Sequence, residues 1–257
     1  MQVGIFADLA RFYDLIYRDK DYAAESDFVY NLLKKYSPGS KSVLELGCGT
    51  GIHAQYLAEQ GLDVSGIDFS MQMLERAQAR RQALPSEVAG KLDFSSGDAR
   101  HIRLGKTFDA VIALFHLMSY QVSNADMNAT LLTAAEHLYP GGVFIFDYWY
   151  GPTVLTERPA VKVKRVEDDA VSLVLVVEPV IHAIENYVEV SYQLFVQDKK
   201  TATIETFRER HRMRYLFQPE IDLFLVNAGL KTCEHGAWMT GGAPGLDTWS
   251  AYSIGQK

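Results

Sequence analysis

The sequence contains few cysteines and no excess of positive charge. Only two cysteines, Cys48 and Cys233, occur in 257 residues, and they form neither a disulfide framework nor a metal-ligand spacing. The 25 basic residues are outnumbered by 32 acidic residues, which gives a formal net charge of −7. This balance argues against a nucleic acid partner, because binding DNA or RNA depends on neutralising phosphates.

Long hydrophobic runs and a signal sequence are also missing. The longest apolar runs, such as residues 171–177, are far below the length of a membrane span. The chain does not begin with a basic region followed by an apolar core, so no signal peptide is visible. We therefore expect a soluble, cytoplasmic protein with no membrane partner. Its length suits one large domain, or one domain with a subdomain.

The most informative stretch runs from Val43 to Gly51, where an apolar run and a glutamate precede three glycines at every second position. Glycines remove Cβ atoms where a ligand must lie against the backbone. The helix-like pattern that follows, Ile52 to Glu59, would present free N–H groups to a carboxylate or a phosphate. The stretch predicts the turn between the first strand and the first helix of a nucleotide-type α/β fold.

The glycine spacing and Glu45 indicate the class of ligand. A dinucleotide fingerprint has a glycine or alanine five residues after its first glycine, where this sequence has Ile52. A fixed carboxylate at Glu45 would repel a pyrophosphate but suits a ligand that carries an ammonium group. These two features favour S-adenosylmethionine over a nicotinamide dinucleotide.

Two further acids follow at suitable places. Asp68 ends a short apolar strand about 20 residues after the loop, where a carboxylate hydrogen-bonds ribose hydroxyls. Asp98 ends a third strand and is placed for the adenine amino group. Each has a simpler interpretation, Asp68 as the cap of a helix that starts near Ser70 and Asp98 as a turn residue. In this order and spacing, the acids together favour cofactor binding.

The order of the predicted elements gives the fold. Strands and helices alternate from Lys41 to Tyr148, which implies a parallel sheet with helices on both faces. Residues 160–215 are β-rich with polar turns, which predicts antiparallel hairpins inserted after a fifth strand at 143–148. A helix at 219–228 and strands near 230–235 and 249–254 complete a Rossmann-like, seven-stranded mixed sheet.

These elements divide the chain into two predicted parts. Residues 1–150 and 216–257 form the cofactor-binding domain, in which residues 1–40 are a helical cap with two helices between residues 7 and 36. Residues 151–215 form the antiparallel insertion. Because the insertion lies above the carboxyl edge of the sheet, where ligands bind, we expect it to cover the substrate, to contact a second copy in a homodimer, or both.

The motifs resemble a known family. E-L-G-C-G-T-G, G-I-D-F-S, S-G-D-A, F-D-A-V and Y-P-G-G-V, between residues 41 and 149, resemble the class I S-adenosylmethionine-dependent methyltransferases. The chain is also similar, nearly end to end, to bacterial nucleotide-sugar N,N-dimethyltransferases, which act on dTDP-3-amino sugars for desosamine and mycaminose. The segments that carry this similarity are Phe12-Tyr13-Asp14, residues 20–25, C-G-T-G-x-H, residues 114–120 and His211-Arg212.

This resemblance implies S-adenosylmethionine as the cofactor and N-methylation of a nucleotide-linked amino sugar, or of a similar small amine. The sequence itself favours an amine only weakly, because its seven histidines are scattered and no metal constellation is visible. A small-molecule O-methyltransferase of the same fold stays open as the alternative.

The resemblance also implies roles for individual residues. Tyr22 would reach the methionine carboxylate, and Tyr13 and Tyr120 would be the catalytic pair beside the transferred methyl group. The expected cofactor contacts are Tyr22, Glu45, Gly47, Cys48, Gly49, Thr50, Gly51, His53, Asp68, Phe69, Met73, Asp98, Ala99 and Leu114. The expected substrate contacts are Tyr17, His116, Trp149 and Arg212, and no metal site is expected. From the residues alone, Tyr13 could instead be a packing residue and His116 a polar contact at a strand end.

One segment departs from the family pattern. The C-terminal loop, residues 241–247, lacks the arginine that would suit a diphosphate. Arg208, Arg210, Arg212 and Arg214 alternate, so they would share one face of a strand. They would either bind phosphate through bidentate contacts or pair across strands with Glu185, Glu189 or Glu205.

Overall fold

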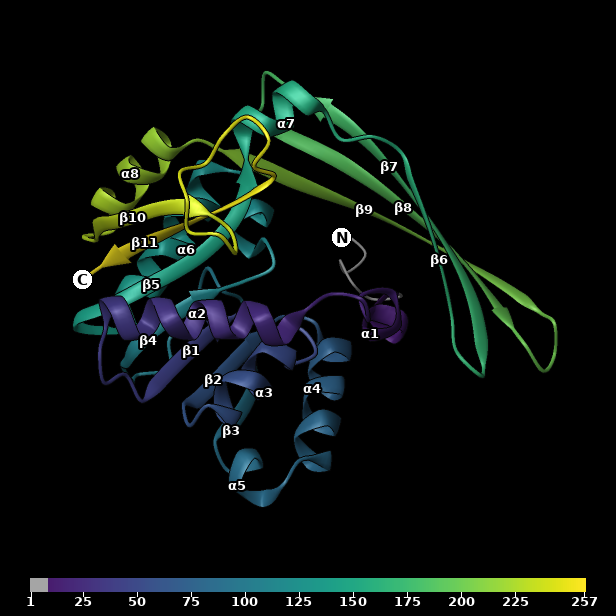
Figure 1. Ribbon diagram of the computed structural model, residues 1–257, viewed down its shortest axis with the longest axis horizontal. Helices are drawn as coiled ribbons and strands as arrows, with labels where there is room; N and C mark the ends of the chain where they lie inside the picture. The colour runs from purple at the N-terminus through teal and green to yellow at the C-terminus, as the bar shows by residue number, and fades with distance from the viewer. Residues whose placement is uncertain (1–8) are drawn as a thin grey trace.

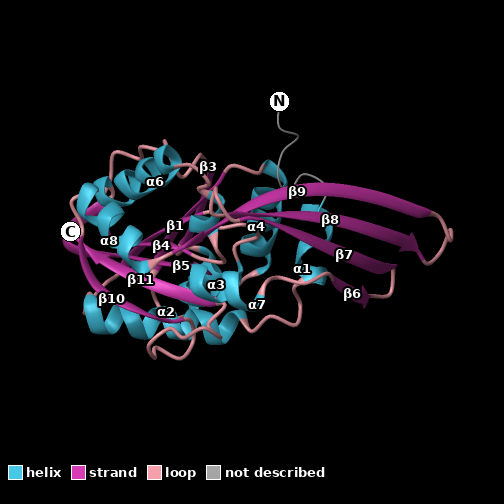
Figure 2. Ribbon diagram, turned by 90° about the horizontal axis from the view of Figure 1, so that it is seen from above, coloured by secondary structure: helices cyan, strands magenta, loops and turns pink. Residues whose placement is uncertain are grey.

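The chain forms a sheet covered by helices on both faces, and a long, twisted antiparallel sheet extends away from it (Figures 1 and 2). A computed structural model describes residues 9–257. Residues 7 and 8 of the predicted helical cap, and residues 1–8 of the predicted cofactor domain, lie outside the described residues. The predicted Rossmann-like α/β fold is confirmed.

The central sheet has the strand order β3-β2-β1-β4-β5-β11-β10. Its first five strands are parallel, whereas β11 is antiparallel to β5 and β10 is antiparallel to β11. The carboxyl ends of β1 to β5 therefore meet at one edge, where α/β proteins bind ligands. The strands are β1 (Ser42–Leu46), β2 (Asp63–Asp68), β3 (Leu92–Ser96), β4 (Phe108–Ala113), β5 (Leu138–Tyr150), β10 (Lys231–Ala237) and β11 (Ser250–Gln256).

Two hydrophobic layers hold the helices against this sheet. Successive side chains of a strand point to opposite faces, so β4 contributes Ala110 and Ile112 to one layer and Val111 and Ala113 to the other. The first layer packs against α2 (Tyr22–Tyr36), α3 (Ile52–Glu59) and α4 (Met71–Ala83), and the second against α6 (Asn124–Glu136) and α8 (Gln218–Asn227). The short helices are η1 (Leu9–Phe12), α1 (Tyr13–Ile16), α5 (Ser86–Ala89), η2 (Leu117–Tyr120) and α7 (Gly151–Glu157). Within residues 9–257, no helix is both long and apolar enough to cross a membrane.

The extending sheet is made of four antiparallel strands, β6 (Lys162–Glu167), β7 (Val171–His182), β8 (Tyr187–Asp198) and β9 (Ile204–Leu216). It is continuous with the central sheet through two residue pairs, Trp149 with Tyr215 and Tyr150 with Leu216. This junction brings the end of β9 beside the end of β5, which is the carboxyl edge of the central sheet.

Three predicted boundaries differ from the structure. The fifth strand, predicted at 143–148, begins at Leu138, because β5 continues through an irregular register opposite β4, with Gly141 at a positive φ of 85°. The fourth strand, for which the apolar run predicts residues 108–115, ends at Ala113, because Phe115 and His116 take left-handed backbone conformations. The helix α7 lies between β5 and the hairpins, where the sequence pattern gave none.

The N-terminal segment η1–α1 lies between the two sheets (Figure 1). On one side, Arg80 of α4 donates to the Asp14 carboxylate at 2.8 Å. On the other side, Leu9, Phe12 and Ile16 pack in the hydrophobic cluster of the β6–β9 sheet. The segment therefore covers the space where the carboxyl edge of the central sheet meets the extending sheet.

Candidate functional site

The glycine loop, residues 47–51, is held against the end of β2. The backbone N–H groups of Gly47 and Cys48 both donate to the carbonyl of Ile67, at 2.7 and 3.0 Å. Gly51 begins α3 with a φ of 75°, and a Cβ atom there would lie 2.7 Å from the ring of Phe94. Glycine is therefore required at that position by both backbone conformation and packing.

Gly49 has a different role in the same loop. Its φ is 54°, but an added Cβ would meet no atom of the described chain within 4 Å. The glycine therefore leaves open space beside the backbone at the carboxyl edge of the sheet. The free N–H groups at the start of α3 lie next in the chain, so the loop forms a cradle for a polar ligand.

Asp68, at the end of β2, supports this cradle. Its Oδ2 accepts from the N–H of Gly49 at 2.9 Å and its Oδ1 from the N–H of Ser70 at 2.8 Å. Burial raises the pKa of Asp68, and these backbone hydrogen bonds oppose the rise. The cap of the following helix is provided by Ser70, whose Oγ accepts from the N–H of Met73 at 3.4 Å. Asp68 is thus a brace between two turns.

Glu45 is the most unusual group of the site. Its carboxylate lies at the end of β1 with 1% of its side chain exposed. Within residues 9–257, its Oε2 has no hydrogen-bond partner, and its Oε1 lies 3.8 Å from Nδ1 of His53. Burial, together with the charge of Asp68, raises the pKa of Glu45 to about 8. A buried carboxylate oxygen without a partner is stabilised when a ligand provides a cation or a hydrogen-bond donor.

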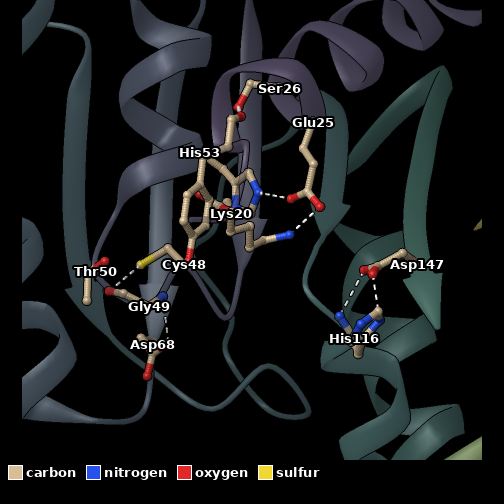
Figure 3. A network of polar contacts seen from close by, with 12 residues as sticks. Lys20, Glu25, Ser26, Cys48, Gly49, Thr50, His53, Asp68, His116 and Asp147 are labelled. Carbon is tan, nitrogen blue, oxygen red and sulfur yellow. Dashed lines mark hydrogen bonds and ion pairs between the residues drawn. The ribbon is translucent and has the colours of Figure 1, made fainter. Parts of the chain in front are cut away.

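A second buried carboxylate, Glu25 of α2, has several partners (Figure 3). Nε2 of His53 lies 2.8 Å from Glu25 Oε2, Nε1 of Trp238 donates to Oε1 at 3.1 Å, and Lys20 forms a close ion pair with it. Burial opposes its charge, but the contacts with His53 and Lys20 hold the pKa of Glu25 at about 2. His53 therefore lies between an ionised carboxylate and the unpaired Glu45.

Tyr22 contributes the other unpaired group. Its ring packs edge-on against His53 with the centroids 5.0 Å apart, and its buried hydroxyl has no hydrogen-bond partner within residues 9–257. The side chains of Tyr22 and Glu45, each with an oxygen that has no partner within residues 9–257, thus both lie beside His53. Lys20 lies over the Phe115 ring at 4.4 Å and brings positive charge near this region.

The predicted catalytic tyrosine Tyr13 lies in an aromatic group. Its ring centroid is 4.8 Å from that of Tyr17 and 6.3 Å from that of Phe115, and the three rings pack with Met73. Burial raises the pKa of Tyr13 well above its usual value. The structure therefore brings Tyr13, Tyr17 and Met73 together, as expected of residues around one site.

Tyr120, at the end of η2, contacts His211, which in turn contacts Glu209, and neither residue was predicted as a site residue. Its hydroxyl lies 2.8 Å from Nδ1 of His211, and Nε2 of His211 lies 2.9 Å from Glu209 Oε2. Glu209 also accepts from the backbone N–H of Leu9 at 3.0 Å. The two-residue repeat of a β-strand could have indicated these residues from the sequence, because Glu209, His211 and Met213 lie on one face of β9.

His116 has a buried acidic neighbour that the sequence analysis also missed. The backbone N–H of His116 donates to Asp147 Oδ1 at 2.9 Å (Figure 3). Its Nδ1 lies 2.7 Å from Asp147 Oδ2, without the angle of a hydrogen bond. The ring of Trp149 lies 6.3 Å away. This arrangement matches the polar strand-end contact that was one interpretation of His116, and substrate binding by His116 and Trp149 stays a prediction.

Of the other predicted cofactor residues, one has a side-chain hydrogen bond, one is exposed and three pack in the apolar layers. Thr50 donates to Asp14 Oδ1 at 2.7 Å, which connects the glycine loop to the N-terminal cap. Phe69 is 53% exposed, so its ring is open to a ligand, whereas Ala99 and Leu114 are part of the apolar layers. The packing of Cys48 in the first layer is that of a small buried hydrophobe.

Asp98 and Arg212 are engaged in ion pairs. Both oxygens of Asp98 accept from Arg100, at distances down to 2.6 Å, and this contact lowers the pKa of Asp98. Arg212 is 56% exposed and lies 3.5 Å from Glu189, its neighbour across β8 and β9. The cross-strand interpretation therefore describes Arg212. Because His211 occupies the buried face of β9, Arg212 points to the opposite face.

The unpaired Glu45 predicts an unusual dependence of stability on pH. Its folded pKa of about 8 exceeds the ordinary glutamate value, so the folded ligand-free protein binds more protons than the unfolded chain between pH ~4.5 and ~8. Stability therefore falls as pH rises through this window, by at most about 1.4 kcal/mol per pH unit from this group. In Glu45→Gln the loss disappears, so urea unfolding between pH 5 and 8 should show the variant gaining stability relative to wild type.

Glu87→Gln, which changes an exposed carboxylate on α5, is the matched control and should follow the wild type across the same range. If the free energy of unfolding of Glu45→Gln changed with pH as it does in the wild type, Glu45 would be ionised in the ligand-free protein. The inference that its unpaired oxygen awaits a cation would then fail.

Comparisons with known proteins agree with this geometry. Residues 43–142 match the family model of a methyltransferase domain. A dTDP-3-amino-3,4,6-trideoxy-alpha-D-glucopyranose N,N-dimethyltransferase of Streptomyces venezuelae is 35% identical over 152 residues, which are 58% of this chain and 61% of that protein. The chain thus spans about three fifths of the length of this relative in the aligned sequence.

Two solved structures extend the likeness to the whole fold. The crystal structure of Streptomyces venezuelae DesVI superposes with a TM-score of 0.79 at 28% identity, covering 98% of this chain and 99% of that chain. The S-adenosylmethionine-bound structure of CalS10, an amino pentose methyltransferase from Micromonospora echinaspora, gives a TM-score of 0.74 at 24% identity, over 100% and 99% of the two chains. Residues 43–142 therefore are a methyltransferase domain, set in a chain that shares its fold with DesVI from end to end.

Proposed function

We propose that this chain is an S-adenosylmethionine-dependent methyltransferase that methylates the amino group of a nucleotide-linked amino sugar. The observation that carries the proposal is the buried, unpaired carboxylate of Glu45 beside the glycine loop. The similarity to an enzyme named for N,N-dimethylation of a dTDP-linked amino sugar supports the acceptor.

The residues present fit this cofactor. Glu45 Oε2 is an acceptor in need of a cation, which the ammonium of the methionine part supplies. Tyr22 Oη is a buried hydroxyl without a partner, suited to donate to the methionine carboxylate. The missing side chain at Gly49 leaves room against the backbone, and Asp68 lies next to it with a carboxylate suited to ribose hydroxyls.

When bound, the cofactor supplies a methyl group on a positively charged sulfur, which an amine displaces in line. The work of the protein is then to align the acceptor, exclude water and take a proton. Tyr13, Tyr17 and Phe115 form an aromatic wall that excludes water. Tyr120, which lies near enough to Tyr13 and Tyr17 for their charges to affect one another's pKa, would orient the amine.

The nucleotide part of the acceptor has less support from the site than the amine. The C-terminal loop has no arginine, Arg212 pairs with Glu189, and Arg214 donates to Glu220 at 2.7 Å. The dTDP group is therefore proposed from the named relative, whereas the amine is also favoured by the tyrosines and carboxylates of the pocket.

The activity is tested with labelled S-adenosylmethionine and dTDP-3-amino-3,4,6-trideoxy-α-D-glucopyranose as the probe. We expect labelled methyl groups on the sugar nitrogen, found by mass spectrometry and NMR of the product. The matched probe is the corresponding 3-hydroxy sugar nucleotide, which should receive no label. Transfer to the hydroxyl sugar, or only to phenols and carboxylates in a panel, would contradict the amine and favour the O-methyltransferase alternative.

Asp68→Asn should weaken binding of S-adenosylhomocysteine by about 1–3 kcal/mol, because the variant leaves donors of the cofactor and of Gly49 without their charged acceptor. Isothermal titration calorimetry measures the change. Asp93→Asn, on the exposed side of β3, is the control and should bind like the wild type. Equal affinity of both variants would mean that Asp68 acts only as a brace within the protein.

We also propose that the β6–β9 sheet covers the substrate and contacts a second copy of the chain. Glu209 and His211 of β9 support the first role, because they contact Tyr120 and the N-terminal cap. Exposed apolar residues support the second, namely Val163 on β6, Val180 on β7 and Ile204 on β9. Light scattering should give the mass of two chains, and a mass of one chain at micromolar concentration would contradict the dimer.

A further inference from the structure

We propose that His211 and Glu209 are positioning residues that carry the proton of the acceptor amine away through Tyr120. This inference rests on the proposed N-methylation and assigns part of its proton transfer to the β6–β9 sheet rather than to the cofactor domain. Tyr120 is the group that would touch the acceptor, and the other two residues act through it.

The three side chains form a continuous chain of short contacts. Tyr120 Oη lies 2.8 Å from His211 Nδ1, and His211 Nε2 lies 2.9 Å from Glu209 Oε2. His211 is 1% exposed and the Glu209 side chain 7%, so the chain is shielded from water. The neighbouring core positions on β8 and β9 are apolar, such as Val190 and Met213, so a buried histidine and a buried glutamate are unusual there.

The geometry sets the direction in which the proton moves. A carboxylate only accepts hydrogen bonds, so Glu209 favours the tautomer of His211 with the proton on Nε2. His211 Nδ1 is then an acceptor and faces the hydroxyl of Tyr120. Tyr120 donates to Nδ1, and its oxygen can accept from the N–H of an amine.

The groups around the relay are mainly aromatic. Tyr192 of β8 has its ring centroid 4.7 Å from that of His211, and Tyr13 and Tyr17 of the N-terminal cap line a cavity of about 10 Å³ with it. The titratable groups around His211 include Tyr13, Tyr17, Tyr120, Tyr192 and Glu209. Glu209 is the carboxylate in this set, and it favours a positive charge on the imidazole.

The proton transfer balances without any further reactant. The N–H proton of the acceptor ammonium passes to Tyr120 Oη as the hydroxyl proton of Tyr120 passes to His211 Nδ1. The nitrogen is left with a lone pair that would attack the methyl carbon, with the thioether sulfur as the leaving group, and the imidazolium ion is stabilised by Glu209. Burial raises the pKa of Tyr120 well above its usual value, so a lasting tyrosinate is disfavoured and Tyr120 must pass on one proton as it takes another.

The same event occurs twice when two methyl groups are added. Each transfer produces an alkylammonium nitrogen, which must lose a proton before it can attack again. The demethylated cofactor must leave between the two transfers, which opens the pocket to solvent, and the imidazolium of His211 would lose its proton to water at that point. The relay would then serve the first and the second methylation alike, and its loss would slow both.

The kinetic test uses His211→Gln and Glu209→Gln with labelled S-adenosylmethionine and dTDP-3-amino-3,4,6-trideoxy-α-D-glucopyranose. We expect kcat at neutral pH to fall on the order of 10²-fold in His211→Gln, with a smaller change in KM, and the acidic limb of its pH profile to move to higher pH. Binding of S-adenosylhomocysteine and the melting temperature report on folding. Lys200→Gln, in the exposed turn between β8 and β9, should keep kcat within about twofold.

A lower kcat with an unchanged pH profile in both relay variants would show a merely structural role and overturn the proposal. A wild type that labels no amine would instead refute the proposed function, and a second readout separates the two cases. Nitrogen-15 NMR of the histidine ring should show His211 with an unprotonated Nδ1 in the wild type and with altered ring-nitrogen shifts in Glu209→Gln. A proton on Nδ1 in the neutral wild-type ring would overturn the relay regardless of turnover.

Discussion

The site depends on Glu45, a buried carboxylate with one oxygen that has no hydrogen-bond partner within residues 9–257. Removing a charge from water costs free energy that a protein usually recovers through a fixed partner. Here Oε2 has no such partner within residues 9–257, and the neighbouring His53 is already held by Glu25. The ligand-free protein therefore keeps Glu45 close to neutral, and a cationic ligand would return its charge. Asp68 and the glycine loop would place that ligand, because one carboxylate accepts from the backbone of both turns.

The N-terminal segment couples this cofactor pocket to the extending sheet. Asp14 contacts Thr50 and Arg80 on the cofactor side, while Leu9 donates to Glu209 on the other side. The aromatic wall between them comes mostly from this segment. The acceptor pocket would therefore be assembled from three parts of the chain that are distant in sequence, and each part contributes a different function. In the proposed function the central sheet would hold the cofactor, the cap would exclude water, and β9 would supply the proton relay.

The sequence predicted the parts of the molecule that depend on local patterns. The glycine loop, Glu45 and Asp68 follow one another within a single strand–turn–helix–strand unit, so spacing alone indicated their place. His211, Glu209 and Asp147 could not be assigned in this way, because their partners are far away in the chain, such as Tyr120, which is separated from His211 by 91 positions. Arg212 was assigned to a substrate from a motif, whereas the register of β8 and β9 pairs it with Glu189. Pairing across strands depends on register, which residue type does not reveal.

Proton release on binding tests the account of Glu45 most directly. S-Adenosylhomocysteine carries the ammonium group without the sulfonium charge, so calorimetry in buffers of different ionisation enthalpy isolates the response of the carboxylate. We expect wild-type protein near pH 7 to release protons on binding, and Glu45→Gln to bind more weakly with that release abolished. Equal proton release and equal affinity in both proteins would contradict the account, because Glu45 would then play no part in receiving the cation.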